Sequence, residues 1–393
     1  MPVDPVTLAV ELIKCPSVTP KESGTLSIIE TVLKNGGFTC NRVERNGVSN
    51  LFARWGDKET GLNFCFNGHV DVVPAGDLNS WSTSPFGAEI KDGFLFGRGA
   101  ADMKSGVAAF VAAAVNFVWA EKPHGSVVLT ISGDEEGPAK DGTLAILDWM
   151  RSRNEKIDHC IVGEPTSISA LGDCLKIGRR GSITFYLTAE GLQGHVAYPD
   201  KALNPLPAMT NLIQILMNKP LDKGSKHFSP SSLNVTTIDT GNTAVNVIPS
   251  QVSSTINIRF NDNHTEESIV QWVRQRIEEV TKKTGVNFDL TCKLSAEPFV
   301  TLPGSFSNLI AETIERELSV KTTLSTSGGT SDARFIKDWC PVVELGLLGE
   351  TMHKIDEKVA VAQIHALSSL YQNILRDYFK QFNRVNSATS QDG

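Results

Sequence analysis

Four apolar runs in this sequence stop abruptly at residues of the kind that bind metal ions. Each run resembles a buried strand, and each is followed within three residues by histidine, aspartate or glutamate. Because ligands in open α/β sheets bind at the carboxyl ends of the strands, this placement predicts a polar site at one edge of a sheet. The runs are 64–68, before His69 and Asp71; 95–99, before Asp102; 127–134, before Glu135 and Glu136; and 160–163, before Glu164.

Taken singly, these residues have ordinary structural explanations. Asp102 can cap a helix that begins near Met103, Glu164 precedes Pro165 in a turn-like sequence, and His69 can be a hydrogen-bonded core histidine. Capping does not explain why four strand-to-loop junctions all carry such residues. Zinc takes imidazole and carboxylate ligands, so we interpret the combination as a metal site.

The composition is that of an ordinary globular protein with two domains. The 393 residues are too many for one core, and hydrophobic and charged residues make up 40% and 21% of them. A net charge of −7 argues against nucleic-acid or membrane partners, and the longest apolar stretch, 107–120, is too short to span a bilayer. Seven scattered cysteines and an N-terminus without signal-peptide features predict a cytoplasmic location.

The first part of the chain alternates between strands and helices. We expect helices over 5–14, 24–35, 104–120 and 143–151, and strands over 38–44, 50–55, 62–68, 126–132 and 159–163. Such alternation predicts the α/β class, with a mostly parallel mixed sheet flanked by helices.

A second pattern begins near residue 181. Residues 181–292 follow the order strand, helix, strand, strand, helix, strand, which predicts an inserted α+β ferredoxin-like domain. The catalytic, metal-binding domain is then discontinuous, with residues 1–180 and 293–383. Its returning part is expected to contain helices over 305–318, 330–338 and 357–381, and residues 384–393 are expected to be a disordered tail.

If the strand ends converge, they supply most of a two-metal site. Two such metals lie ~3.5–4 Å apart and share a carboxylate. His353, from the returning segment, can complete the ligand set. One of the adjacent glutamates is expected to be a ligand and the other a base, because neighbouring side chains point apart. Asp71 is expected to hold the second nitrogen of His69 and so fix its tautomer.

The motifs at 68–74, 97–106, 134–137 and 163–166 together resemble those of the dinuclear zinc amidohydrolases, a family that includes acetylornithine deacetylases, aminoacylases and carboxypeptidase-G-type enzymes. The resemblance covers nearly the whole chain. It implies two Zn²⁺ per subunit, with Co²⁺ able to substitute. It also implies that Asp102 bridges the metals, that His69 and Glu164 hold one and Glu136 and His353 the other, and that Glu135 is the general base.

Within the family, segments 176–182, 327–335 and 352–357 are most similar to desuccinylases of lysine and diaminopimelate biosynthesis. Their substrate, N-succinyl-LL-2,6-diaminopimelate, is a small molecule with several carboxylates. The resemblance also implies a homodimer through the inserted domain, with His195 reaching the partner's active site to bind the oxyanion. The implied substrate contacts are Arg179, Ser182, Tyr198, Asn246, Arg259, Gly329 and Thr330.

One position departs from the desuccinylase pattern. Gly349, four residues before His353, stands where those enzymes carry asparagine. Hydrolysis of another N-acyl amino acid, such as acetylornithine, therefore stays open. Two further alternatives are a metal-free binding protein on the same fold and a structural dimerisation module in which Glu135 and Glu136 are merely solvated.

Overall fold

The computed structural model describes residues 2–389, and side chains as far as residue 382. The chain forms two compact units. The inserted unit consists of Gly178–Val300 and Thr326–Thr330, and the main unit consists of the residues before, between and after these segments. The expected division at 181 and 292 differs from these boundaries by a few residues at each end, and it did not anticipate that 326–330 belong with the insertion.

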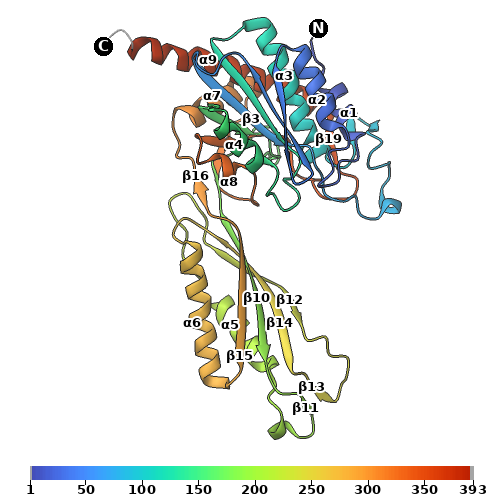
Figure 1. Ribbon diagram of the computed structural model, residues 1–393, viewed down its shortest axis with the longest axis vertical. Helices are drawn as coiled ribbons and strands as arrows, with labels where there is room; N and C mark the ends of the chain where they lie inside the picture. The colour runs from blue at the N-terminus through green and yellow to red at the C-terminus, as the bar shows by residue number, and fades with distance from the viewer. Residues whose placement is uncertain (1, 390–393) are drawn as a thin grey trace. The chain divides into compact units, whose positions relative to one another are not determined.

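A mixed eight-stranded sheet is the centre of the main unit (Figure 1). Its middle strands β6, β3, β7 and β18 are parallel to one another, while antiparallel pairs join β1 to β2, β2 to β6 and β18 to β8. This matches the predicted α/β class. In spatial order the strands are β1 (Thr39–Arg45), β2 (Val48–Trp55), β6 (Gly125–Ser132), β3 (Leu62–His69), β7 (His159–Val162), β18 (Val342–Glu344), β8 (Cys174–Lys176) and β17 (Thr323–Ser325).

Helices flank this sheet (Figure 1). The most buried is α3, which packs against α1 and α9 and is apolar on nearly every face. The helical stretch Ala100–Glu121, which includes α3, is the one among the described residues that is long and apolar enough to cross a membrane, and 83% of it is buried inside the protein. The helices are α1 (Pro5–Ile13), α2 (Thr25–Asn35), α3 (Ser105–Glu121), α4 (Thr143–Ser152), α7 (Ser305–Leu318), α8 (Ala333–Ile336) and α9 (Val361–Thr389).

The returning segment differs from the prediction in three places. The expected helix over 330–338 is only the single turn α8. Glu357 does not begin the last helix, because residues Lys358–Ala360 form β19 and pair with β5 (Phe94–Phe96). The last helix then continues to Thr389, well into the expected disordered tail, since α9 contains neither glycine nor proline to end it. Residues 390–393 lie outside the described part of the chain.

The inserted unit has a four-stranded antiparallel sheet in the order β12, β14, β10, β15. The predicted order of strands and helices is confirmed: β10 (Gly181–Glu190), α5 (Leu206–Asn218), β12 (Ser232–Asp239), β14 (Gln251–Phe260), α6 (Glu266–Thr284) and β15 (Asn287–Ala296).

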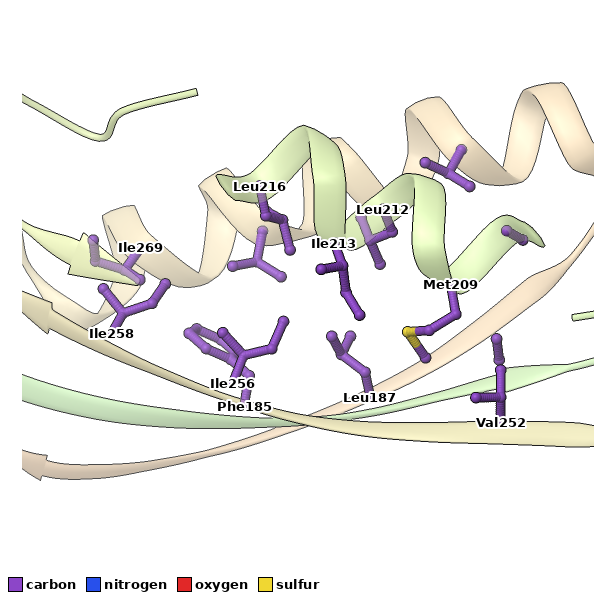
Figure 2. Close-up of a cluster of buried hydrophobic side chains, with 14 of the residues drawn as sticks. Phe185, Leu187, Met209, Leu212, Ile213, Leu216, Val252, Ile256, Ile258 and Ile269 are labelled. Atoms are coloured by element: carbon purple, nitrogen blue, oxygen red, sulfur yellow. The ribbon is translucent and has the colours of Figure 1, made fainter. Parts of the chain in front are cut away.

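The core of the inserted unit lies between its sheet and its two helices. Figure 2 shows Leu212 and Leu216 of α5 pointing toward Phe185 of β10 and Ile256 of β14. All four side chains are buried. Alternate residues of β10 and β14 face this core, which is the period expected for strands covered on one face.

Candidate functional site

Three neighbouring strands deliver the predicted ligands to one edge of the main sheet. β6, β3 and β7 are adjacent and parallel, so their carboxyl ends lie together. His69 is the last residue of β3, Glu135 and Glu136 follow shortly after β6, and Glu164 comes two residues after β7. Asp102 joins them from the helical turn η2 (Ala100–Lys104), where its backbone is not helical (φ −123°, ψ 99°).

Close packing around Met103 fixes how these segments approach one another. A Cβ atom added to Gly68 would lie 2.7 Å from the Cε atom of Met103, and one added to Gly163 would lie 2.8 Å from the same atom. Each glycine immediately precedes a ligand, His69 or Glu164. The absence of side chains there lets the residue after Asp102 pack between two strand ends.

The imidazole of His69 is buried and points its Nε2 atom at two carboxylates. Its Nδ1 atom lies 2.9 Å from the backbone carbonyl oxygen of Asp71. A carbonyl only accepts, so Nδ1 carries a hydrogen and Nε2 is the nitrogen directed at the carboxylates. Nε2 lies 3.2 Å from Oδ1 of Asp102 and 3.9 Å from Oε1 of Glu164. Asp71 does contact the second nitrogen of His69, but through its carbonyl, since its carboxylate is 3.7 Å away.

The carboxylate of Asp102 faces two different histidines. Its Oδ1 atom faces His69, while its Oδ2 atom lies 3.3 Å from Nε2 of His353. The same nitrogen of His353 lies 2.9 Å from Oε1 of Glu136. Each oxygen of Asp102 therefore has its own imidazole, and each imidazole has a second carboxylate. Groups with ligand atoms within 4.8 Å of one another are His69–Asp102–Glu136 and His69–Glu135–Glu164.

Charges in this cluster perturb one another. Burial lowers the pKa of His69, but its hydrogen bond to Asp102 and the surrounding carboxylates outweigh burial and raise it. Hydrogen bonds to Asp102 and Glu136 raise the pKa of His353 to about 10. Burial, and then the charge of Glu164, raises the pKa of Glu135 well above its ordinary value. Two imidazoles among a larger number of carboxylates form a donor set that fits two divalent cations.

The side chain of Asp71 holds the loop that carries both glutamates. It is fully buried, and its oxygens accept hydrogen bonds from the backbone N–H groups of Glu135, at 3.1 and 3.2 Å, and of Glu136, at 3.0 Å. Because these bonds fix the backbone of adjacent residues, they set the directions in which the two carboxylates point.

Replacing Asp71 by asparagine is therefore expected to lower kcat by about 10–100-fold, since an amide NH₂ would face a backbone N–H donor. Steady-state kinetics at saturating metal measure this loss. Asp134→Asn is the matched control, because buried Asp134 accepts N–H groups of Lys140 and Asp141 in the same loop but touches neither glutamate's backbone. Equal losses in the two variants would contradict a specific role for Asp71.

The other predicted site residues lie in the inserted unit and form two groups. The first surrounds the start of β10: Ser182 pairs in register with Arg259, and the Nη1 atom of Arg179 donates to the carbonyl of Ser327, 3.4 Å away, beside Gly329 and Thr330.

The second group lies beyond the other end of β10. His195 is on β11 (Gly194–His195), which pairs with β13 (Val247–Ile248). The rings of His195 and Tyr198 are 5.8 Å apart, and the N–H group of Val196 donates to the carbonyl of Asn246. Ser182 and Glu190, near opposite ends of β10, are separated by about 26 Å at the usual rise of a strand. The structure thus places in two separate groups the residues of the inserted unit that the sequence analysis assigned to one active site.

Sequence reasoning missed two buried charged residues beside the site, Arg98 and Glu357. Their side chains form an ion pair of 2.7 Å and are only 3% and 1% exposed. The arginine within Gly97-Arg98-Gly99 was an available signal, because a charge flanked by glycines in an apolar run needs a partner. Its partner lies more than 250 residues away in a segment expected to be helical, so spacing alone could not identify it.

Comparison with known proteins identifies the family to which this chain belongs. The profile of peptidase family M20/M25/M40 matches residues 65–377. A relative from Cereibacter sphaeroides, named succinyl-diaminopimelate desuccinylase, is 57% identical over 379 residues, which cover 96% of this chain and all of the relative. Relatives of the same name from Ruegeria pomeroyi and Dinoroseobacter shibae are 55% and 54% identical, each with 96% of this chain covered.

Solved structures show the same fold at much lower identity. An M20 family metallo-carboxypeptidase from Sulfolobus solfataricus has a TM-score of 0.77 at 17% identity, with 96% of this chain and 99% of that chain covered. A dinuclear metal binding peptidase of the M20 family from Bacillus subtilis has a TM-score of 0.72 at 15% identity, with 96% and 98% covered. The chain therefore belongs to peptidase family M20/M25/M40 and is a metal-dependent amidohydrolase.

Proposed function

We propose that the chain hydrolyses N-succinyl-LL-2,6-diaminopimelate to succinate and LL-2,6-diaminopimelate with two Zn²⁺ per subunit, which Co²⁺ can replace. The observation that carries the hydrolytic part is the position of Asp102, whose two oxygens face two separate imidazole–glutamate pairs. Relatives more than 50% identical over nearly the whole chain are named for this substrate, which supports the choice of acyl group.

In the proposed site, His69 and Glu164 hold one metal, Glu136 and His353 hold the other, and Asp102 bridges them. When bound, two zinc ions supply Lewis acidity toward the amide carbonyl and lower the pKa of water. The Nδ1–H bond of His69 to the carbonyl of Asp71 keeps Nε2 available as a ligand atom.

Glu135 is the proposed general base. It takes a proton from water as the water oxygen bonds to the amide carbon, and returns a proton to the nitrogen as the C–N bond breaks. A base near neutral pH needs a carboxyl whose pKa lies above the usual range. Burial and the neighbouring Glu164 raise the pKa of Glu135 in that direction.

Arg259 supports an anionic substrate. Its Nη1 atom is buried and has no hydrogen-bond partner among the described residues, and its Nε atom donates only to the amide oxygen of Asn257. Burial and the positive charge of the nearby Arg180 lower the pKa of Arg259. Arginine binds carboxylates bidentately, and the proposed substrate carries several of them.

The separation of the two groups along β10 supports a homodimer. About 26 Å is longer than an N-acyl amino acid, so one substrate cannot touch Ser182 and His195 of the same subunit at once. We propose that His195 serves the partner's site and donates to the oxyanion. Its Nδ1 atom accepts the N–H group of Ala197 at 3.1 Å, which leaves Nε2–H as an outward-facing donor on an exposed side chain.

Mixing two inactive variants tests this arrangement. His195→Ala alone is expected to lose ~3–4 kcal/mol of transition-state stabilisation, and Glu135→Ala loses the base. In a mixed dimer, the subunit with intact Glu135 receives an intact His195 from its partner. Equimolar mixing with subunit exchange should therefore restore about a quarter of wild-type activity. If His195 acted within its own subunit, mixing would restore none.

The acyl preference is tested by assaying zinc-loaded protein with N-succinyl-LL-2,6-diaminopimelate and N-acetylornithine at equal concentrations. We expect kcat/KM to favour the succinyl substrate by at least ~100-fold, because a cationic pocket left without its carboxylate is penalised strongly. Preference for acetylornithine would support the second candidate function, which the departure at Gly349 favours. Substrate binding without turnover, in protein that takes up no zinc, would support the metal-free binding protein.

We also expect a cytoplasmic protein that binds no nucleic acid and no membrane. The support is the net charge of −7, since either surface attracts basic proteins.

A further inference from the structure

The ion pair between Arg98 and Glu357 is linked to the three segments that carry His69, Asp102 and His353. Burying a charge pair is costly unless further hydrogen bonds satisfy the two groups. Here the Nε atom of Arg98 is the one buried atom of the pair that has no hydrogen-bond partner among the described residues. Most of the hydrogen-bonding groups of Arg98 and Glu357 go to the backbone of those segments rather than to each other.

Glu357 fixes the backbone on either side of Asp102. Its Oε1 atom accepts the N–H groups of Ala101, at 2.8 Å, and of Asp102 itself, at 3.0 Å. Its Oε2 atom accepts the N–H group of Gly99 at 3.0 Å and one N–H of Arg98. The carboxylate thereby holds the part of η2 in which the backbone departs from helical geometry.

Arg98 connects that turn to the other two segments. Its Nη1 atom also donates to the carbonyl of Lys354, the residue after His353, at 3.1 Å. Its Nη2 atom donates to the carbonyl of Pro74, in the loop that follows His69, at 3.3 Å. The planar guanidinium presents its donors in fixed directions, so one side chain sets the spacing of three backbone segments.

The segment from His353 to Glu357 needs such an anchor. His353 and Asp356 both have left-handed backbones, with φ of 61° and 57°, a conformation that is uncommon for residues other than glycine, although His and Asp adopt it more often than most. The carbonyl of Glu357 accepts the N–H group of Gly97, and the N–H group of Ser82 donates to Asp356 at 2.7 Å. His353 itself is exposed, so side-chain packing does not fix it.

We propose that Arg98 and Glu357 are positioning residues for the dinuclear site, which hold His353 and Asp102 at the spacing that a pair of metal ions requires. Removing either side chain weakens the binding of the metal held by His353 and Glu136, although neither side chain is a ligand. The metal held by His69 and Glu164 is less affected, because those residues end strands of the central sheet. The proposal rests on the two-metal site of the proposed function and not on the acyl group cleaved.

The test measures metal binding directly. Metal-free Arg98→Lys protein is titrated with Zn²⁺ against a chromophoric chelator, and two dissociation constants are fitted. We expect the affinity of one site to fall by about 10–100-fold and that of the other to change by less than about 3-fold. The weakened site should be the one that Glu136→Ala removes. Lysine keeps the charge but cannot reach three acceptors at once. Glu357→Gln removes one acceptor and adds opposing donors, so it should likewise weaken one zinc site and not the other. It replaces Arg98→Lys in the test if that variant is insoluble.

Arg54→Lys is the matched control. Arg54 is also buried, pairs with Glu155 at 2.7 Å and donates to the carbonyl of Lys156. Its other contacts, with the side chains of Asn63 and Ser126, lie at the ends of β3 and β6 away from His69 and Glu135. It should lower the melting temperature as Arg98→Lys does and leave both zinc affinities unchanged. The proposal is overturned if both affinities of Arg98→Lys equal those of the wild type, or if Arg54→Lys weakens zinc as much. Because zinc binding is read without substrate, a wrong acyl group would leave this result intact.

Discussion

Glu135→Ala is expected to bind two metal ions as tightly as the wild type while kcat falls by about 10²–10⁴-fold or more. The reason is geometric and electrostatic. Asp102 and Glu136 contact the imidazole of His353, and Asp102 and Glu164 lie nearest Nε2 of His69, so both proposed sets are complete without Glu135, although its carboxylate lies within 4.8 Å of ligand atoms of His69 and Glu164. Its pKa, raised by burial and by Glu164, suits a group that takes up and returns a proton. Metal content by mass spectrometry and single-turnover rates measure the two quantities separately.

The neighbouring glutamate provides the contrast. Glu136→Ala should lose one metal per subunit, because Glu136 is 2.9 Å from His353 and completes that set. Glu135→Gln keeps the shape of the side chain but cannot take a proton, and it should resemble Glu135→Ala. Near-normal turnover in Glu135→Gln, or loss of a metal from it, would reverse the assignment of the pair.

Asp102→Ala is expected to have the other large effect, the loss of both metals and of all measurable turnover. In the proposed site its two oxygens are shared between the two ligand sets, so neither set is complete without them. The two histidines would also lose the carboxylate that lies between them. Equilibrium dialysis with Zn²⁺ and the rate of succinate release measure the outcome.

Asp158→Ala is the control for Asp102→Ala. Asp158 precedes β7 at the end of the sheet opposite Glu164, where its carboxylate accepts the N–H group of Asn63 at 2.7 Å. Its loss should reduce stability but leave metal content at two per subunit. Retention of both metals by Asp102→Ala would show that Asp102 does not bridge them.

Much of the fold, and the convergence of the predicted ligands, was predictable from the sequence, because both depend on local pattern. Strand β3 is an apolar run that ends at His69, and helix α3 is a run of small and branched residues at helical spacing. The carboxyl ends of adjacent parallel strands must meet at one edge, so ligands that follow such strands converge whatever the loops between them do.

Features that depend on contacts between segments far apart in the sequence were not predictable. Glu357 was expected in a helix, but its segment pairs with β5, and Arg98 gains its partner only through that contact. The contact from Asp71 to His69 was expected from a carboxylate and comes from a carbonyl, since the strand ends before Asp71 and the side chain turns toward the glutamate loop. The separation of Ser182 from His195 follows from the length of β10, which a list of motifs does not contain.

The position of Met103 has a consequence for how such a site can change over time. Its terminal methyl group fills the space that side chains at Gly68 and Gly163 would occupy, one residue before His69 and Glu164. The same atoms therefore determine both the hydrophobic interior and the geometry around the ions. Substitutions that would count as conservative in most interiors, such as methionine to leucine, act here as adjustments of coordination, so selection on the chemistry extends into the apolar centre of the molecule.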